Sequence, residues 1–420
     1  MAREMKDSGI EWIGEIGFDF YMMKLKYVSI ILDQFRKPVT ADQRNQEGEM
    51  LYDYYGASGV IDKINGYTID DHVMLIGEDG ANLKMRNLPL MYEVNGKAWI
   101  NNHAHILKPK QGMDFYYLFY VLEAIDINPY ITGSAQPKLS QESLKNIWIP
   151  VPNVNIQKKI VCCIKGVCIE LDNVLQKTRS SIEEYKKLKQ AVITQAVTKG
   201  VRGDREMKDS GIEWNGRIPV EWNTINPKAL FRQRKDKAFE SEQQLTASQQ
   251  YGIMYQSDYM DLTGTKVVTV EKDFDILKHV EAGDFVISMR SFQGGLEYSE
   301  LSGSISSAYV MLVPNLELVY PRFYRWLLKS EVYIRALQST SNMVRDGQAM
   351  RYSNFSQVRL YIVPMKEQEE IAQYLDEKCA VIDALIAKKE QYLSEIENYK
   401  KSLIYEYVTG KKEVPCESTD

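Results

Sequence analysis

One segment occurs twice in this chain, and that repetition constrains the fold more than any other feature of the sequence. Residues 3–16 read REMKDSGIEWIGEI and residues 205–218 read REMKDSGIEWNGRI, so twelve of fourteen positions are identical. The offset of 202 in a chain of 420 residues places the second copy near the midpoint. A period this long exceeds that of a solenoid unit, so the sequence predicts two tandem halves in a pseudo-two-fold arrangement.

Two longer segments repeat as well, and both have the apolar spacing of a long helix. Residues 156–198 contain no proline and one glycine, and residues 366–408 follow the same pattern at an offset of 211. Apolar or near-apolar residues recur at steps of three and four, as in coiled coils. The first seam comprises Ile160, Ile164, Val167, Leu171, Val174, Thr178, Ile182, Tyr185, Leu188, Val192 and Ala196. The second comprises Ile371, Leu375, Lys378, Ile382, Leu385, Lys389, Tyr392, Ile396, Tyr399 and Leu403.

Each predicted helix has one apolar seam and a charged remainder, so each needs a partner for its seam. We expect the two helices to pack as an antiparallel coiled coil; the alternative is two independent helices, each packed on its own domain. The predicted fold class is α+β: two α/β domains separated by two long helices, with a pseudo-two-fold internal repeat. The domains are residues 1–152 and 201–364, each with a leader copy, the helices are residues 153–200 and 365–412, and residues 413–420 form a tail.

Between the repeated segments, the two mixed domains have little in common. Short apolar runs separated by turn signals such as Asn95-Gly96 predict strands. In the first domain we expect strands at 67–69, 72–76, 97–100, 103–107 and 149–152, and helices at 114–125 and 140–145. In the second we expect strands at 267–270, 284–287, 308–313 and 360–364, and a helix at 321–338. A common frame that carries two unlike inserts indicates two domains that recognise different targets.

The composition favours a cytoplasmic globular protein. The five cysteines form no CxxC pair, which argues against a disulfide framework or a zinc site. The N-terminus lacks the apolar core of a signal peptide, and no run of about 18 apolar residues predicts a membrane span. The net charge of -5 leaves a nucleic-acid partner open, because binding needs a local basic face and not a basic total.

The sequence contains none of the common catalytic motifs that we considered. It has no GxxxxGK[ST] phosphate loop, no HExxH zinc motif and no GxSxG nucleophile elbow. His103 and His105 alternate along an expected strand and should share one face, which is more often a polar sheet face than a metal site. We therefore expect no catalytic residue and no metal in this chain.

Basic residues gather in one stretch of each mixed domain. Residues 84–110 hold five Lys/Arg against one acid, and residues 228–237 also have a net charge of +4. Residues 290–295 and 345–348 place arginine and glutamine on glycine-containing loops. Lysine and arginine neutralise phosphates, whereas arginine, asparagine and glutamine read base edges. A single basic patch is as often an ordinary solvated surface as a binding surface. The presence of one patch in each half argues more strongly for nucleic-acid binding.

Several quoted segments together resemble one known family, the specificity subunit of type I restriction-modification systems. The segments are KDSGIEWIGEI with its repeat KDSGIEWNGRIP, GSAQPKLSQESLKNIWIPVP, VPMKEQEEIAQYLDEKCAVIDALI, and the helix ends VTKG and VTGK. The resemblance covers essentially the whole chain. The first leader departs from the commoner pattern, with Gly17 and Phe20 where the second has Pro219 and Trp222.

The resemblance implies two target-recognition domains that each read one half of a bipartite DNA sequence, with helices that set the spacing and bind two methyltransferase subunits. Restriction subunits would join these, and S-adenosylmethionine, ATP and Mg would belong to the partner subunits, with no cofactor in this chain. The candidate DNA contacts, chosen by residue type and loop placement, are Lys84, Arg86, Asn101, Asn102, Gln136 and Lys138 in the first domain and Arg290, Gln293, Arg345 and Gln348 in the second. Two alternatives stay open: the recognition half of a split methyltransferase-nuclease with its own activity, and a coiled-coil protein adaptor. The leader copies, with Trp12, Trp214, Ile10 and Ile212, are expected to anchor each half to the shared frame.

Overall fold

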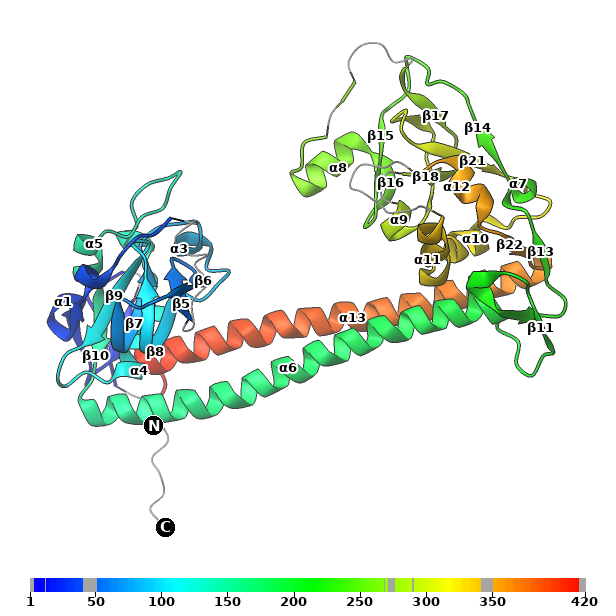
Figure 1. The fold of residues 1–420 in the computed structure, drawn as a ribbon. Coiled ribbons are helices and arrows are strands. Elements are labelled where there is room, and N and C mark those ends of the chain that lie inside the picture. Colours follow the sequence, from blue (N-terminus) through cyan, green and yellow to red (C-terminus); the bar gives the residue numbers. More distant parts are fainter. Residues whose placement is uncertain are drawn as a thin grey trace. The chain divides into compact units, whose positions relative to one another are not determined.

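The chain divides into two compact units in the computed structural model. Unit 1 comprises Met1–Arg179 and Gln391–Asp420, and unit 2 comprises Ser180–Glu390. The structure describes residues 4–11, 13–40, 51–267, 269–270, 276–288, 291–340 and 350–414. Each unit contains a part of both long helices, α6 (Val154–Lys199) and α13 (Met365–Val408) (Figure 1). The apolar stretches 156–198 and 366–408 predicted both helices to within two residues of these ends, whereas the expected range 365–412 runs four residues past the end of α13.

The repeated leader forms the same hairpin in both units. In unit 1, β1 (Met5–Asp7) pairs with β2 (Glu15–Gly17), and in unit 2, β11 (Met207–Asp209) pairs with β12 (Arg217–Pro219) in the equivalent register. The next turn is also shared, because the amide of Phe20 donates to Gly17 and that of Trp222 donates to Pro219. Both aromatic side chains are fully buried, so the departures in the first leader do not change its packing mode.

The anchoring role expected of the leader is confirmed for its described residues. Ile212 belongs to the core of unit 2, and Ile10 packs against that of unit 1. The Trp214 indole donates to the Arg359 carbonyl at 3.0 Å and packs against the ring of Tyr361. Trp12 lies outside the described residues.

A curved sheet of six strands forms the body of unit 1. Its order is β4 (Ser29–Ile31), β9 (Ala104–Pro109), β7 (Ile69–Gly77), β8 (Met91–Ile100), β5 (Leu51–Gly56) and β6 (Gly59–Asn65). Every pairing is antiparallel except that of β5 with β8. A ribbon of β3 (Tyr21–Lys24) and β10 (Trp148–Val151) lies beside it, with the short helices α1 (Leu25–Val28), η1 (Asp33–Phe35), α3 (Asn82–Met85) and η2 (Asn128–Tyr130) in the connections.

Two expectations about this sheet were wrong. Residues 67–69 and 72–76 do not form separate strands, because β7 is one continuous strand. Asn95-Gly96 is not a turn, because cross-strand pairing to His72 and Asp71 extends β8 through it. The helices α4 (Phe115–Ala124) and α5 (Gln141–Lys145) were predicted correctly, and the Asp114 side chain caps α4 by accepting from the Tyr117 amide at 3.0 Å.

Unit 2 has a different, smaller sheet on the same frame. A four-stranded sheet has the order β14 (Phe231–Arg234), β21 (Val310–Pro314), β18 (Phe285–Ile287) and β19 (Glu297–Tyr298). Three two-stranded ribbons join it: β13 (Asn223–Ile225) with β22 (Leu360–Ile362), β15 (Leu245–Ser248) with β16 (Gly252–Tyr255), and β17 (Lys278–Val280) with β20 (Gly303–Ile305). Its helices are α7 (Pro227–Leu230), η3 (Glu213–Asn215), α8 (Gln256–Thr263), α9 (Ser291–Gly294), α10 (Pro321–Leu327), α11 (Glu331–Ser339) and α12 (Tyr352–Gln357).

Two expectations about unit 2 also need correction. The helix expected at 321–338 is two helices, because Ser330 begins a new one and its side chain accepts from the Tyr333 amide. A strand was expected at 267–270, but the described residues of this range are not in a strand. There, the side chain of Gln244 hydrogen-bonds the backbone of Val270 in both directions, at 2.7 and 2.9 Å, in place of a neighbouring strand.

The helices α6 and α13 run antiparallel and make equivalent contacts in the two units. In unit 1, Lys400 binds Asp172 at 2.6 Å; in unit 2, Lys189 binds Asp383 at 2.6 Å. Asp172 and Asp383 are equivalent positions of the repeat, and so are Lys189 and Lys400. The two ion pairs are therefore the same pair, with the roles of α6 and α13 exchanged. This pairing supports antiparallel packing of the two helices over the alternative of independent helices.

The predicted seam was only partly right on each helix. Val174 and Leu188 of α6 and Lys378, Leu385, Tyr392 and Tyr399 of α13 are exposed, whereas Thr178, Ile182, Ala196, Ile382, Ile396 and Leu403 are buried as predicted. Leu175, Ile193 and Cys379, each next to a predicted position, are buried as well. A straight helix has 3.6 residues per turn, so its buried stripe drifts from a strict heptad to the next residue. Each helix therefore keeps apolar side chains outside the intramolecular contact. No helix among the described residues has the length and apolarity to cross a bilayer.

Candidate nucleic-acid interface

Three loops of unit 1 meet where β7 ends, and they contain five of the six DNA contacts predicted for the first domain. Strands β8 and β9 pair with opposite edges of β7, and the short turn 101–103 connects them. The amide of Glu78, which follows β7, donates to the His103 carbonyl at 2.8 Å. Residues 132–139 close over the same place, because Leu139 donates to the Glu78 carbonyl at 2.7 Å. We call residues 78–84, 101–103 and 132–139 the loop cluster.

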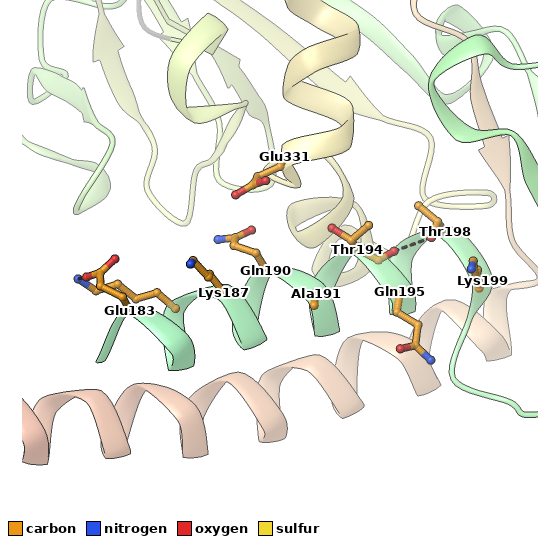
Figure 2. Close-up of a pocket in the computed structure, with 10 residues that line it drawn as sticks. Glu183, Lys187, Gln190, Ala191, Thr194, Gln195, Thr198, Lys199 and Glu331 are labelled. Carbon is orange, nitrogen blue, oxygen red and sulfur yellow. Dashed lines mark hydrogen bonds and ion pairs between the residues drawn. The ribbon is translucent and has the colours of Figure 1, made fainter. Parts of the chain in front are cut away.

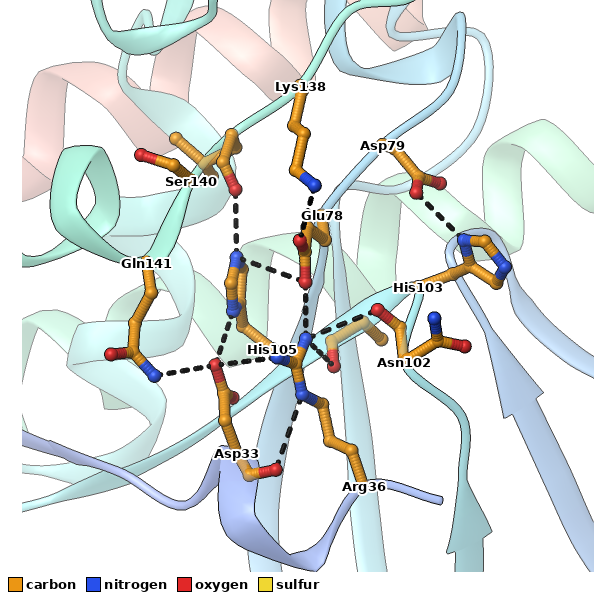
Figure 3. A network of polar contacts seen from close by, with 12 residues as sticks. Asp33, Arg36, Glu78, Asp79, Asn102, His103, His105, Lys138, Ser140 and Gln141 are labelled. Atoms are coloured by element: carbon orange, nitrogen blue, oxygen red, sulfur yellow. Dashed lines mark hydrogen bonds and ion pairs between the residues drawn. The ribbon is translucent and has the colours of Figure 1, made fainter. Parts of the chain in front are cut away.

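A buried histidine holds two of the elements around this cluster together. His105 is only 1% exposed. Its Nδ1 lies 2.7 Å from Asp33 Oδ2, and its Nε2 lies 2.8 Å from the Leu139 carbonyl (Figure 3). Both partner oxygens are hydrogen-bond acceptors. The Gln141 amide also donates to Asp33 at 2.9 Å, so the network ties η1, β9 and the end of the 132–139 loop.

The carboxylate of Glu78 lies at the centre of the same network. Arg36 donates to one of its oxygens, and the Lys138 ammonium lies 3.1 Å from the other (Figure 3). Burial raises the pKa of Glu78, but the hydrogen bonds from Arg36 and Lys138 outweigh it and leave the pKa below its usual value. Burial likewise raises the pKa of Asp33, and the bonds from His105, Ile106 and Gln141 bring it below the usual value. Both groups are therefore carboxylates at neutral pH.

Four of the six predicted contacts of the first domain are exposed on the loop cluster or beside it. Lys84, at the edge of the cluster, donates to the Gly133 carbonyl at 3.3 Å, which brings its ammonium to the 132–139 loop. Asn102, Gln136 and Lys138 are also exposed. These side chains combine two phosphate-binding cations with two amides that can read bases.

The other two predicted residues of this domain have structural contacts. Asn101 is buried, and its Oδ1 accepts from the His103 amide at 2.7 Å. Arg86 has a left-handed backbone (φ 53°), and its guanidinium donates to the Glu123 carbonyl and, at 3.5 Å, to the Ile125 carbonyl. It thus caps the carboxyl end of α4. These contacts stabilise the interface from behind.

Some charged side chains of the second basic stretch, residues 228–237, bind other groups within unit 2. Arg234 binds both oxygens of the buried Asp284, at 2.6 and 3.1 Å, and also binds Asp236. The hydrogen bond to Asp284 raises the pKa of Arg234, so this cation joins β14 to the residue before β18. Gln293 is exposed on α9, and the adjacent Gly294 lies close to the Gln249 side chain of the β15–β16 turn. Arg290, Arg345 and Gln348 lie outside the described residues.

Sequence reasoning missed the charged residues beneath the loop cluster. Asp33, Arg36, Glu78 and His105 occur in unremarkable local contexts, and no spacing links them. The expectation that His103 and His105 share a strand face was also wrong, because His103 lies in the turn before β9. A single sequence offers no signal for such a network, since only the sheet order brings its members together.

A groove of about 930 Å³ runs along α6 in unit 2 (Figure 2). Lysine, glutamine, threonine and glutamate side chains line it, including Lys187, Gln190 and Thr194, with Glu331 of α11 on the far side. Across the part of the chain that the structure describes, no group of three His, Cys, Asp or Glu side chains is placed to hold a metal.

Comparisons with known proteins agree with this arrangement. A family model described as the type I restriction modification DNA specificity domain matches residues 19–184. A putative type I restriction enzyme specificity subunit of Haemophilus influenzae is 34% identical over 161 residues, 38% of each chain. Another from Methanocaldococcus jannaschii is 25% identical over 318 residues, 73% of this chain and 70% of that one. A solved chain from work on complex assembly and conformational transition of the type I R-M system matches with a TM-score of 0.68 at 13% identity, over 94% of this chain and 99% of the other. At that identity the structural likeness shows the fold.

Proposed function

Because the chain belongs to the family of type I restriction-modification specificity subunits, we propose that it is the DNA-recognition subunit of such a complex and that each unit reads one half-site. One observation supports this proposal above all: a repeated frame supports two unlike domains. The hairpins and ion pairs repeat position by position, whereas a six-stranded sheet in unit 1 corresponds to a four-stranded sheet in unit 2. Two unlike readers fit a bipartite target with two different halves.

The loop cluster is the proposed DNA-binding surface of unit 1. Lys84 and Lys138 bind phosphates, and Asn102 and Gln136 face the bases. Glu78 holds Lys138 in place, and the paired carboxylates below add no unpaired negative charge at the surface. In unit 2, Gln293 on α9 has the corresponding role, together with the predicted Arg290, Arg345 and Gln348.

The long helices are the proposed spacer between the two readers. A helix of 46 residues, such as α6, is about 69 Å long. A rigid connection of fixed length fixes the distance between half-sites, as dimer geometry does in other DNA-binding proteins. The helix length thus determines how many unread base pairs separate the two halves.

The exposed apolar residues of the helices are the proposed docking positions for two methyltransferase subunits. In unit 1, the ion-pair register places Val174 level with Tyr399; in unit 2, it places Leu188 level with Leu385. These are again equivalent positions of the repeat, and all four are exposed. The same apolar pair in each unit suits two copies of one partner. Methyl transfer, with S-adenosylmethionine, and restriction, with ATP and Mg, belong in this proposal to the partner subunits.

Reconstitution with the modification subunits tests the proposal. The assembled complex should bind and methylate a bipartite DNA sequence, with an affinity that falls steeply as salt increases. Binding of the partner subunits without any effect on DNA recognition would identify the chain as a protein adaptor. Methyl transfer by the isolated chain would identify it as an enzyme. Either result would overturn the proposal.

A further inference from the structure

His103 is the one residue of the 101–103 turn whose backbone is fixed on both sides. Its amide donates to Asn101 Oδ1 at 2.7 Å, and its carbonyl accepts from the Glu78 amide at 2.8 Å. The neighbouring Asn102 carbonyl accepts from Arg36 at 3.2 Å. Few conformations remain for this turn, so a side chain on it has a defined position before any DNA binds.

The imidazole of His103 is oriented by an adjacent carboxylate. Nδ1 lies 2.7 Å from Asp79 Oδ2, while the His103 side chain stays 51% exposed. A carboxylate only accepts, so Nδ1 carries the proton of this bond and Nε2 lies at the open end of the ring. In Figure 3, the ring lies outside the Glu78 network. Among the hydrogen bonds of the described residues, Nε2 has no partner within the chain.

The chemistry of this pair differs from that of the nearby lysines. The contact with Asp79 leaves Nε2 as a single, directed polar atom at the exposed end of the ring. Asp79 also repels phosphates, which disfavours a contact with the DNA backbone at this place. A directed polar atom beside a carboxylate suits a base edge, because each base pair presents its own set of donors and acceptors in the major groove.

We propose that His103, positioned by Asp79, reads one base edge in the half-site bound by unit 1. This inference rests on the proposed function, since it assigns one base contact within that site. Asp79 is a positioning residue, because it acts through the orientation of the ring.

The test uses the assembled methyltransferase complex with His103→Ala, His103→Gln and Asp79→Asn, and maps the methylated motif on genomic DNA. His103→Ala should relax one base position in one half-site, with roughly tenfold weaker discrimination there and no change in the other half-site. Asp79→Asn should weaken discrimination at the same position. His103→Gln, which keeps a hydrogen-bonding side chain, should retain part of the discrimination, and this variant tests the inference if the alanine variant fails to assemble.

The matched control is His72→Ala. His72 also binds a carboxylate, Glu93 at 2.8 Å, but it stacks on Phe115 instead of lying in the loop cluster. Its replacement should leave the motif unchanged. An unchanged motif in the His103 variants, or a uniform loss at all sequences, would overturn the inference while the function stands. A wild-type complex without sequence preference would instead overturn the proposed function.

Discussion

Two buried glutamines give the sharpest energetic test of the repeated frame. Gln157 and Gln368 are equivalent positions near the start of α6 and α13, and both are at most 1% exposed. The Gln157 amide donates to the Pro152 carbonyl at 2.8 Å and to the Gly112 carbonyl at 3.3 Å, and its Oε1 accepts from the Asp114 amide at 2.8 Å. One side chain thus joins the start of α6, the loop before α4 and the end of β10.

Gln368 makes the same three contacts in unit 2. Its amide donates to the carbonyls of Val363 at 2.7 Å and Leu318 at 2.9 Å, and its Oε1 accepts from the Tyr320 amide at 2.7 Å. Replacement by leucine keeps the approximate volume but removes all three hydrogen bonds. One of the abandoned carbonyls in each unit is buried and the other contacts are partly buried. At roughly 1 kcal/mol per contact, each variant should lose about 3 kcal/mol of stability.

Denaturant unfolding followed by circular dichroism measures this loss, and hydrogen exchange locates it. Gln157→Leu should weaken protection in unit 1, at the start of α4, and Gln368→Leu should weaken it in unit 2, at the start of α10. Gln176→Leu is the matched control, because Gln176 is exposed on the same helix α6, and its effect should stay within about 0.5 kcal/mol. A loss below about 1 kcal/mol in either buried position, or clearly unequal losses in the two units, would refute the reasoning.

Three further predictions concern acid stability, DNA affinity and spacing. The folded-state pKa of Asp33 lies below its unfolded value, so its stabilising contribution is present above the unfolded pKa of about 3.9 and is lost as the pH falls through the folded pKa. Asp33→Asn should therefore lower Tm at pH 7 and flatten the fall of Tm from about pH 5 to pH 3; an unchanged pH profile would contradict this. Lys84→Ala and Lys138→Ala should each reduce the slope of log affinity against log salt by about 0.9 without changing the methylated motif, and gel shifts at several salt concentrations check this. Deletion of residues 176–182 of α6 together with the facing residues 390–396 of α13 removes about 10 Å and keeps the proposed docking residues, so the spacer in the methylated motif should shorten by about three base pairs; an unchanged spacer would disprove the spacer role.

Much of the frame could be predicted from the sequence because its signals are local. Identical leader copies imply identical hairpins, and the proline-free stretches with apolar steps of three and four predict α6 and α13 almost to their ends. The same local signals failed where tertiary pairing decides. Pairing to β7 extends β8 through Asn95-Gly96, which read as a turn, and the buried stripe passes to Leu175 where the heptad pattern had selected Val174.

The candidate site was predictable only in part, for a related physical reason. Residue type and loop composition selected Lys84, Asn102, Gln136 and Lys138, which the fold then brings together. The sequence by itself determined that this protein has two halves, two long helices and two different inserts, because repetition and periodicity are properties of neighbouring residues. Only the tertiary structure decided that His105 holds the 132–139 loop and that Asp79 orients His103, because the order of strands in the sheet brings these distant residues together.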